Sequence, residues 1–252
     1  MSEKSADPVK RVQEAARQQR LKRFYKAAGV EEGKTGFAVR LDGRAVRTPG
    51  KAPLAVPARA IAEGIAAEWD AQGDYVDPAT MPLTRLANTI IDGVAIAGSR
   101  AAVIDEIVSF GASDLLCYRA EEPDGLVERE RAAWDPVLAW ARDRFGARFR
   151  LAAGIVHVEQ DPAILDKLRQ DIENEDSFVI GALASMTNLT GSALLPLAVL
   201  RGFLSAGDAW AAAHVDEDWQ ISLWGADAEA AARRAFRWKD MAAAAQVLAA
   251  LA

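Results

Sequence analysis

The stretch that decides the fold is residues 36–57, which reads GFAVRLDGRAVRTPGKAPLAVP. Its apolar residues alternate with polar ones, which is typical of strands with one buried face. Asp42-Gly43 and Pro49-Gly50 are turn dipeptides, and they divide the stretch into short strands at residues 36–41, 44–48 and 52–56. We therefore expect a β-meander in this part of the chain.

After Pro57 the spacing of apolar residues changes from two to four, because Ile61, Ile65 and Trp69 recur at helical intervals. We interpret Trp69 as a structural residue that packs between this helix and the sheet. Further helices are predicted at residues 83–97, 100–110, 126–145, 162–173, 176–188, 192–204, 208–224 and 227–248. Two extended pieces, residues 115–118 and 149–158, either pair with each other or join the N-terminal sheet.

The order of these elements predicts an α+β protein, in which a small N-terminal β-rich domain is followed by a larger, mainly α-helical domain. We place a basic N-terminal arm at residues 1–20, the β-rich domain with one helix at 21–80, and the helical domain at 81–252. Residues 8–28 have few large apolar side chains and are interpreted as a charged helix or a partly ordered arm. A chain of 252 residues that is 51% hydrophobic can bury a substantial core.

Just before the meander, AGVEEGKT matches the loose form of a phosphate-binding loop. Such a loop needs a buried strand before it and a helix after it. The preceding RQQRLKRFYK is too basic for a buried strand, and the following GFAVRL alternates like a strand. We therefore interpret this segment as a Gly-rich turn, with Lys34 as a turn residue.

Charge is unevenly distributed, because residues 1–60 hold 14 Lys or Arg against 6 Asp or Glu, while the remainder holds 16 against 30. Acidic residues interrupt the basic end, no aromatic residues alternate with the basic ones, and the rest of the chain would repel phosphate. These features argue against nucleic-acid binding.

Residues 178–200 carry no charge and are long enough to be weighed as a membrane span. Polar residues and Pro196 interrupt them, so we expect two buried helices joined at residues 189–191 and no membrane insertion.

The sequence gives little support for catalysis. Its two histidines, His157 and His214, and its single cysteine, Cys117, have no metal-ligand spacing, and no nucleophile elbow or zinc-protease helix is present. We expect no catalytic residue, no metal and no cofactor. The single cysteine and the absence of a basic-then-apolar leader favour a reducing compartment, and we expect the cytoplasm.

One segment combines dense negative charge with aromatic surface. Residues 215–225 read VDEDWQISLWG, in which Asp216, Glu217 and Asp218 precede Trp219 and Trp224. Large aromatic anchors beside charges are typical of protein interfaces. The alternative is a helix whose charged face is solvated and whose Trp residues lie in the core, and the sequence leaves both readings open.

A set of motifs resembles the assembly chaperones of the ATP synthase catalytic head, the family that binds the free α subunit. They are RFYKAAGV, FAVRLDGRAVRTPGKAPLAVP, AAEWDAQGDYVDPATMPLTRLANTIID, SDLLCYRA and DEDWQISLWG. The resemblance covers roughly residues 21–241. The resemblance implies a β-rich domain, a helical domain, no catalytic activity and no cofactor. The family is well known from mitochondria, whereas the absence of a leader here favours a bacterial protein.

The resemblance further implies that this protein binds the α subunit where the β subunit later docks, and so promotes assembly. A family carboxylate associated with client binding corresponds to Asp216, Glu217 or Asp218, of which we favour Glu217. Trp219 and Trp224 complete the predicted partner-binding set, and the EWD tryptophan, Trp69, remains structural. We expect a monomer. The alternatives are a small-molecule enzyme using Arg85 or Asn88 between the two domains, and a nucleic-acid-binding module led by the basic arm.

Overall fold

The computed structural model describes residues 21–34, 36–146, 148–154 and 156–252. The predicted basic arm at residues 1–20 lies outside this range. By its internal contacts the chain divides into two compact units: residues up to Arg47 together with Pro53–Arg85, and Thr48–Ala52 together with Leu86–Ala252. The predicted α+β class is confirmed, because an antiparallel sheet comes first and helices make up most of the remainder.

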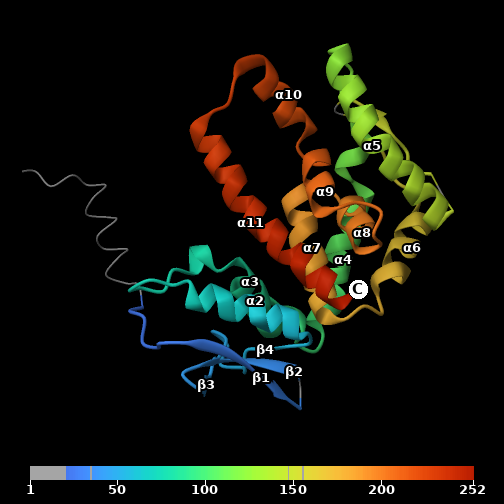
Figure 1. Cartoon of the computed structure of the whole chain (residues 1–252). Helices are drawn as coiled ribbons and strands as arrows, with labels where there is room; N and C mark the ends of the chain where they lie inside the picture. The colour runs from blue at the N-terminus through green and yellow to red at the C-terminus, as the bar shows by residue number, and fades with distance from the viewer. Residues whose placement is uncertain (1–20, 35, 147, 155) are drawn as a thin grey trace, which may run out of the picture. The chain divides into compact units, whose positions relative to one another are not determined.

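The first unit contains a four-stranded antiparallel sheet and a helix (Figure 1). Its elements are β1 (Ala28–Gly33), β2 (Gly36–Leu41), β3 (Arg44–Ala45), β4 (Ala55–Val56) and α2 (Arg59–Asp70). Strand β2 is central, since it pairs with β1 over its whole length and with β3 and β4 on its other edge. Helix α2 packs on this sheet and buries Ile61 and Ile65.

Strand β1 corrects the prediction for the segment that contains AGVEEGKT. Residues predicted as a Gly-rich turn form an edge strand in register with β2, from Ala28 opposite Leu41 to Gly33 opposite Gly36. Residues 21–27 form no helix, and Lys22 forms a bridge with Tyr75. A strand, β2, follows the motif, so no helix N-terminus is present there to receive a phosphate. The predicted strands at 44–48 and 52–56 are shorter than expected.

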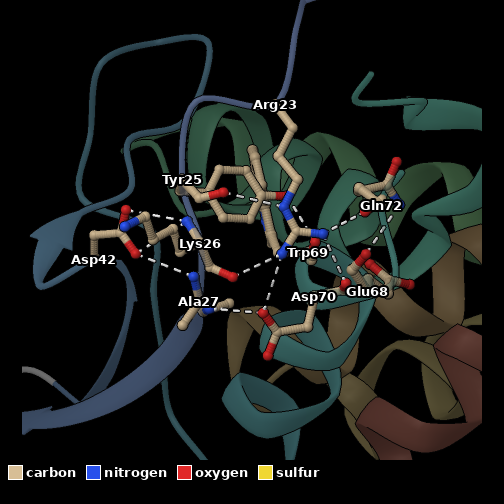
Figure 2. Close-up of polar contacts among 10 residues, drawn as sticks. Arg23, Tyr25, Lys26, Ala27, Asp42, Glu68, Trp69, Asp70 and Gln72 are labelled. Carbon is tan, nitrogen blue, oxygen red and sulfur yellow. Dashed lines mark hydrogen bonds and ion pairs between the residues drawn. The ribbon is translucent and has the colours of Figure 1, made fainter. Parts of the chain in front are cut away.

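Arg23 ties the extended segment before β1 to the end of α2 (Figure 2). Its guanidinium donates hydrogen bonds to the carbonyl oxygens of Asp70, at 3.0 Å, and of Gln72. These carbonyls belong to the C-terminal end of α2, where no helical N–H remains to pair with them. Trp69 lies beside the same segment, because its carbonyl accepts a 2.6 Å hydrogen bond from the Tyr25 hydroxyl and the two rings meet edge to face.

The second unit is a helical assembly in which α7 (Ser177–Thr190) contacts both α4 (Ser99–Ala112) and α11 (Ala228–Leu251) (Figure 1). The remaining helices are α5 (Asp124–Phe145), α6 (Pro162–Ile172), α8 (Leu194–Leu200), α9 (Ala206–Ala212) and α10 (Val215–Trp224). Helix α3 (Pro82–Thr89) begins in the first unit, ends in the second and continues into a π-helical turn at Ile90–Val94. Short 3-10 turns lie at Pro78–Thr80 in the first unit and at Leu115–Cys117 in the second.

Uncharged residues 178–200 form buried helices α7 and α8, joined around Gly191, as expected. No helix among the described residues is both long and apolar enough to cross a bilayer. The two extended pieces pair with each other, because β5 (Tyr118–Arg119) and β6 (Ala152–Ala153) form a short parallel ladder. The sequence left open whether these pieces pair with each other or join the N-terminal sheet, and they pair with each other.

Asp114 joins two distant parts of the second unit. Its buried carboxylate accepts hydrogen bonds from the backbone N–H groups of Leu116, Ala193 and Leu194, at 2.8–3.1 Å. It therefore caps both the 3-10 turn at Leu115–Cys117 and the start of α8. Burial raises the pKa of Asp114 to about 6, although the hydrogen bonds that it accepts oppose this shift.

Candidate functional site

The acidic and aromatic residues singled out in the sequence lie on α10, which has no buried residue. The sequence predicted one helix over residues 208–224, but the helix breaks at Ala213 and His214 into α9 and α10. His214 is buried, its Nδ1–H donates a 2.7 Å hydrogen bond to the carbonyl of Trp210, and its ring lies against the Trp210 ring. Gly225, with a φ of 84°, ends α10.

Asp218 faces α11 and is already paired. Its carboxylate receives two hydrogen bonds from the guanidinium of Arg234, one of them 3.1 Å long between Oδ2 and Nη2. This hydrogen bonding holds the pKa of Asp218 below its usual value, so the carboxylate stays charged. Asp218 therefore attaches α10 to α11.

Asp216 faces the opposite way, toward α5. It lies against Glu130, which is 1% exposed and accepts a 2.9 Å hydrogen bond from the backbone N–H of Ala120. Burial raises the pKa of Glu130, and the nearby charge and hydrogen bond of Asp216 raise it further. The side chains of Glu130 and Asp216 are within hydrogen-bonding reach of each other, so this contact also holds α10 in place.

Trp219 packs against α5 instead of pointing into solvent. The guanidinium of Arg129 lies 4.9 Å from the centre of its ring, which is a cation–π distance. The outer edge of the same ring lies over Gly125. Trp219 is thus a third attachment of α10, on the same side as Asp216.

Glu217 and Trp224 remain on the outer side of α10. Together with Gln220 they recur at a spacing of three and then four residues, so they share one face of the helix. Within the described part of the chain, the Glu217 carboxylate makes no hydrogen bond or ion pair. Trp224 is 86% exposed and its neighbour Leu223 is 55% exposed. An unpaired carboxylate therefore stands beside a large apolar surface.

The outer face of α10 forms one wall of a groove of about 420 Å³. The other wall is the first half of α11, where Arg233, Arg237 and Ala230 lie on one face, and His214 lies at the inner end. The Arg233 side chain is 63% exposed. The groove therefore offers a carboxylate and an aromatic ring on one side and guanidinium groups on the other, which suits a polypeptide with charged and apolar side chains.

The other sequence candidates contribute little chemistry. Cys117 is buried, as expected, and burial raises its pKa to about 12, so its thiol is unreactive. His157 contacts the Tyr118 hydroxyl through Nδ1 at 3.1 Å. Among the described residues, no group of three His, Cys, Asp or Glu is arranged to hold a metal ion.

The comparisons with known proteins agree with one another. Residues 22–142 match the family model described as ATP12 chaperone protein. The structure is similar to the crystal structure of Atp12 from Paracoccus denitrificans, with a TM-score of 0.83 and 40% sequence identity over 92% of this chain and 99% of that one. The chain belongs to the ATP12 chaperone family.

Two further relatives extend this result for the ATP12 chaperone. A crystal structure of the Agrobacterium tumefaciens protein Atu1473 has a TM-score of 0.88 and 45% identity, over 98% of this chain and 92% of that one. The mitochondrial protein atp12 of Schizosaccharomyces pombe is 23% identical over 215 residues, or 81% of this chain and 74% of the relative.

Family membership makes this ATP12 protein a non-catalytic chaperone for ATP synthase assembly, as the resemblance implied. The alternative reading, a small-molecule enzyme using Arg85 or Asn88, is wrong. The sequence did not reveal Gly125, Arg129, Glu130 and Arg234, the residues that hold α10. They lie on α5 and α11, far from the acidic triplet along the chain, and no local motif marks them.

Proposed function

We propose that this chaperone binds the free α subunit of ATP synthase through the outer face of α10, and shields the surface that the β subunit later covers. The observation that carries the proposal is the unpaired Glu217 beside the exposed Trp224. Exposed apolar surface of this kind on a folded protein commonly marks a protein-binding site. Free subunits that expose an interface tend to associate wrongly until the proper partner arrives.

Within this proposal the five predicted partner-binding residues divide into two roles. Glu217 and Trp224 contact the client, because they line the groove between α10 and α11 and the Glu217 carboxylate makes no hydrogen bond or ion pair within the described residues. Asp216, Asp218 and Trp219 hold α10 in place through Glu130, Arg234 and Arg129. Trp69 belongs to the first unit and has a structural role there, because it contacts Tyr25. We further propose that the protein is a monomer, and that it is cytoplasmic, since relatives at 40 and 45% identity come from bacteria.

Charge reversal at Glu217 tests this function. The chaperone is co-expressed with the ATP synthase α subunit of its own organism, and the soluble complex is measured by gel filtration with light scattering. We expect a stoichiometric complex with the wild type. With Glu217→Lys the affinity should be lower by at least about tenfold, because a positive side chain at residue 217 would repel the client cation that Glu217 attracts.

The matched control is Glu63→Lys, which makes the same charge change on an exposed position of α2. This variant should bind the α subunit as the wild type does. Equal binding by Glu217→Lys and Glu63→Lys would show that α10 does not meet the client through Glu217, and aggregation of the α subunit despite wild-type chaperone would contradict the function itself.

A further inference from the structure

Helix α10 depends on a small number of side-chain contacts for its position, since none of its residues is buried. Asp218 reaches Arg234 on α11, whereas Asp216 and Trp219 reach α5. A helix held in this way can rotate about its axis when one attachment is lost. Such a rotation would move Glu217 and Trp224 relative to the groove.

The contact between Trp219 and α5 leaves no room for a side chain at residue 125. A Cβ atom added to Gly125 would lie 2.8 Å from Cη2, 3.1 Å from Cζ3 and 3.8 Å from Cζ2 of Trp219. The first distance is shorter than carbon atoms tolerate without movement. All three atoms belong to the six-membered ring of the indole, so Gly125 accommodates the outer edge of that ring.

Arg129 completes this contact from the next turn of α5. It lies four residues after Gly125, so both residues are on the same face of the helix. The Arg129 guanidinium covers the face of the indole while Gly125 admits its edge. The indole is therefore held at its face and at its edge. Because Trp219 belongs to α10, these two contacts also limit the rotation of α10 about its axis.

We propose that Gly125 is a positioning residue for client binding, because it lets Trp219 seat α10 with Glu217 and Trp224 facing the groove. This inference rests on the proposed function of α10 and adds α5 to the binding device. Gly125 does not touch the client. It acts only through Trp219, because the indole can occupy its position only if residue 125 has no Cβ atom.

The test is a double-mutant cycle with Gly125→Ala and Trp219→Phe. The added methyl group in Gly125→Ala should displace the indole and lower the affinity for the α subunit by about tenfold. Phenylalanine lacks the outer ring with which the methyl group collides. The double variant should therefore bind within about threefold of the Trp219→Phe variant, which keeps part of the packing on Arg129.

Hydrogen exchange of residues 215–224, measured without client, gives a second readout. Exchange in this helix should be faster in Gly125→Ala than in the wild type, and the double variant should match Trp219→Phe. The control is Gly207→Ala, because Gly207 is also the second residue of a helix, α9, and its added Cβ would meet Ser205 at an ordinary 3.6 Å. This control should change neither readout.

The outcomes separate this inference from the proposed function. Two outcomes would overturn the inference if Glu217→Lys still weakens the complex. The first is that Gly125→Ala changes neither hydrogen exchange nor binding. The second is that Gly125→Ala speeds hydrogen exchange but leaves binding unchanged. A loss in Gly125→Ala that Trp219→Phe does not relieve would also overturn it, because the methyl group would then act elsewhere. If Glu217→Lys binds like the wild type, the proposed function fails first.

Discussion

Asp114→Ala is expected to lower the free energy of unfolding by about 3 kcal/mol or more at pH 7, because it leaves buried donors unpaired. The carboxylate accepts hydrogen bonds from the backbone N–H groups of Leu116, Ala193 and Leu194. Each unpaired buried donor costs about 1–3 kcal/mol, and the ionised carboxylate's own burial cost, which the variant no longer bears, offsets only part of the sum. Urea unfolding monitored by circular dichroism measures the change.

The control for this prediction is Asp161→Ala. Asp161 also caps a helix, since its side chain accepts a 2.9 Å hydrogen bond from the backbone N–H of Ala163 at the start of α6, but it is exposed. Water can replace the lost acceptor there, so the expected cost is about 1 kcal/mol. Similar losses in the two variants would mean that the burial of Asp114 does not matter to stability.

The loss in Asp114→Ala should also depend on pH. Because burial raises the native-state pKa of Asp114 to about 6, the native protein keeps a proton that the unfolded chain releases near its ordinary pKa. The contribution of this group to the free energy of unfolding therefore decreases as the pH rises from about 4 to about 6. The alanine variant lacks this dependence, so its deficit should be about 1 kcal/mol larger at pH 5 than at pH 7. A deficit that grows with pH would contradict the raised pKa.

Gly36→Ala is expected to destabilise the first unit by at least about 3 kcal/mol, through backbone strain and a steric clash together. Gly36 has a φ of 119°, a conformation that side chains rarely adopt. A Cβ atom there would lie 2.4 Å from the carbonyl oxygen of Val56, in the backbone of β4. The methyl group would therefore push β4 away from β2. Hydrogen exchange of residues 36–41 and 55–56 should be much faster in the variant.

Gly29→Ala supplies the opposite expectation within the same sheet. Gly29 lies on β1, and an added Cβ atom would have no neighbour within 4 Å among the described residues. Alanine restricts the unfolded chain more than glycine does, so a gain of about 0.5 kcal/mol is expected. If both glycine variants lose stability to the same extent, the clash with Val56 is not the cause.

The spacing of apolar residues correctly predicted those strands and helices in which the apolar positions are also the buried ones. The alternation in residues 36–41 and the helical spacing of Ile61 and Ile65 correspond to β2 and α2. Strand β1 was missed because Val30 is its only large apolar residue, and its strand geometry comes from pairing with β2. The break at His214 was missed because no local residue pattern marks it; in the structure the buried imidazole packs on the Trp210 ring at this point.

The candidate site was only partly visible in the sequence for a similar reason. Neighbouring letters show the acidic triplet and its tryptophans, and these do lie together on α10. What distinguishes Glu217 from Asp216 and Asp218 is the identity of their partners on other helices. Those partners, Glu130 and Arg234, meet α10 only through tertiary packing. Sequence alone could therefore place these residues on one helix, but it could not identify their partners on α5 and α11.

The lack of buried residues on α10 also affects how this protein can evolve. Substitutions at Glu217, Gln220 and Trp224 remove no core packing, so they should change the free energy of unfolding by less than about 0.5 kcal/mol. Under the proposed function, recognition can then change in step with the client while the fold is preserved. A combinatorial library at these three positions should yield mostly folded proteins, from which chaperones for foreign or altered subunits can be selected.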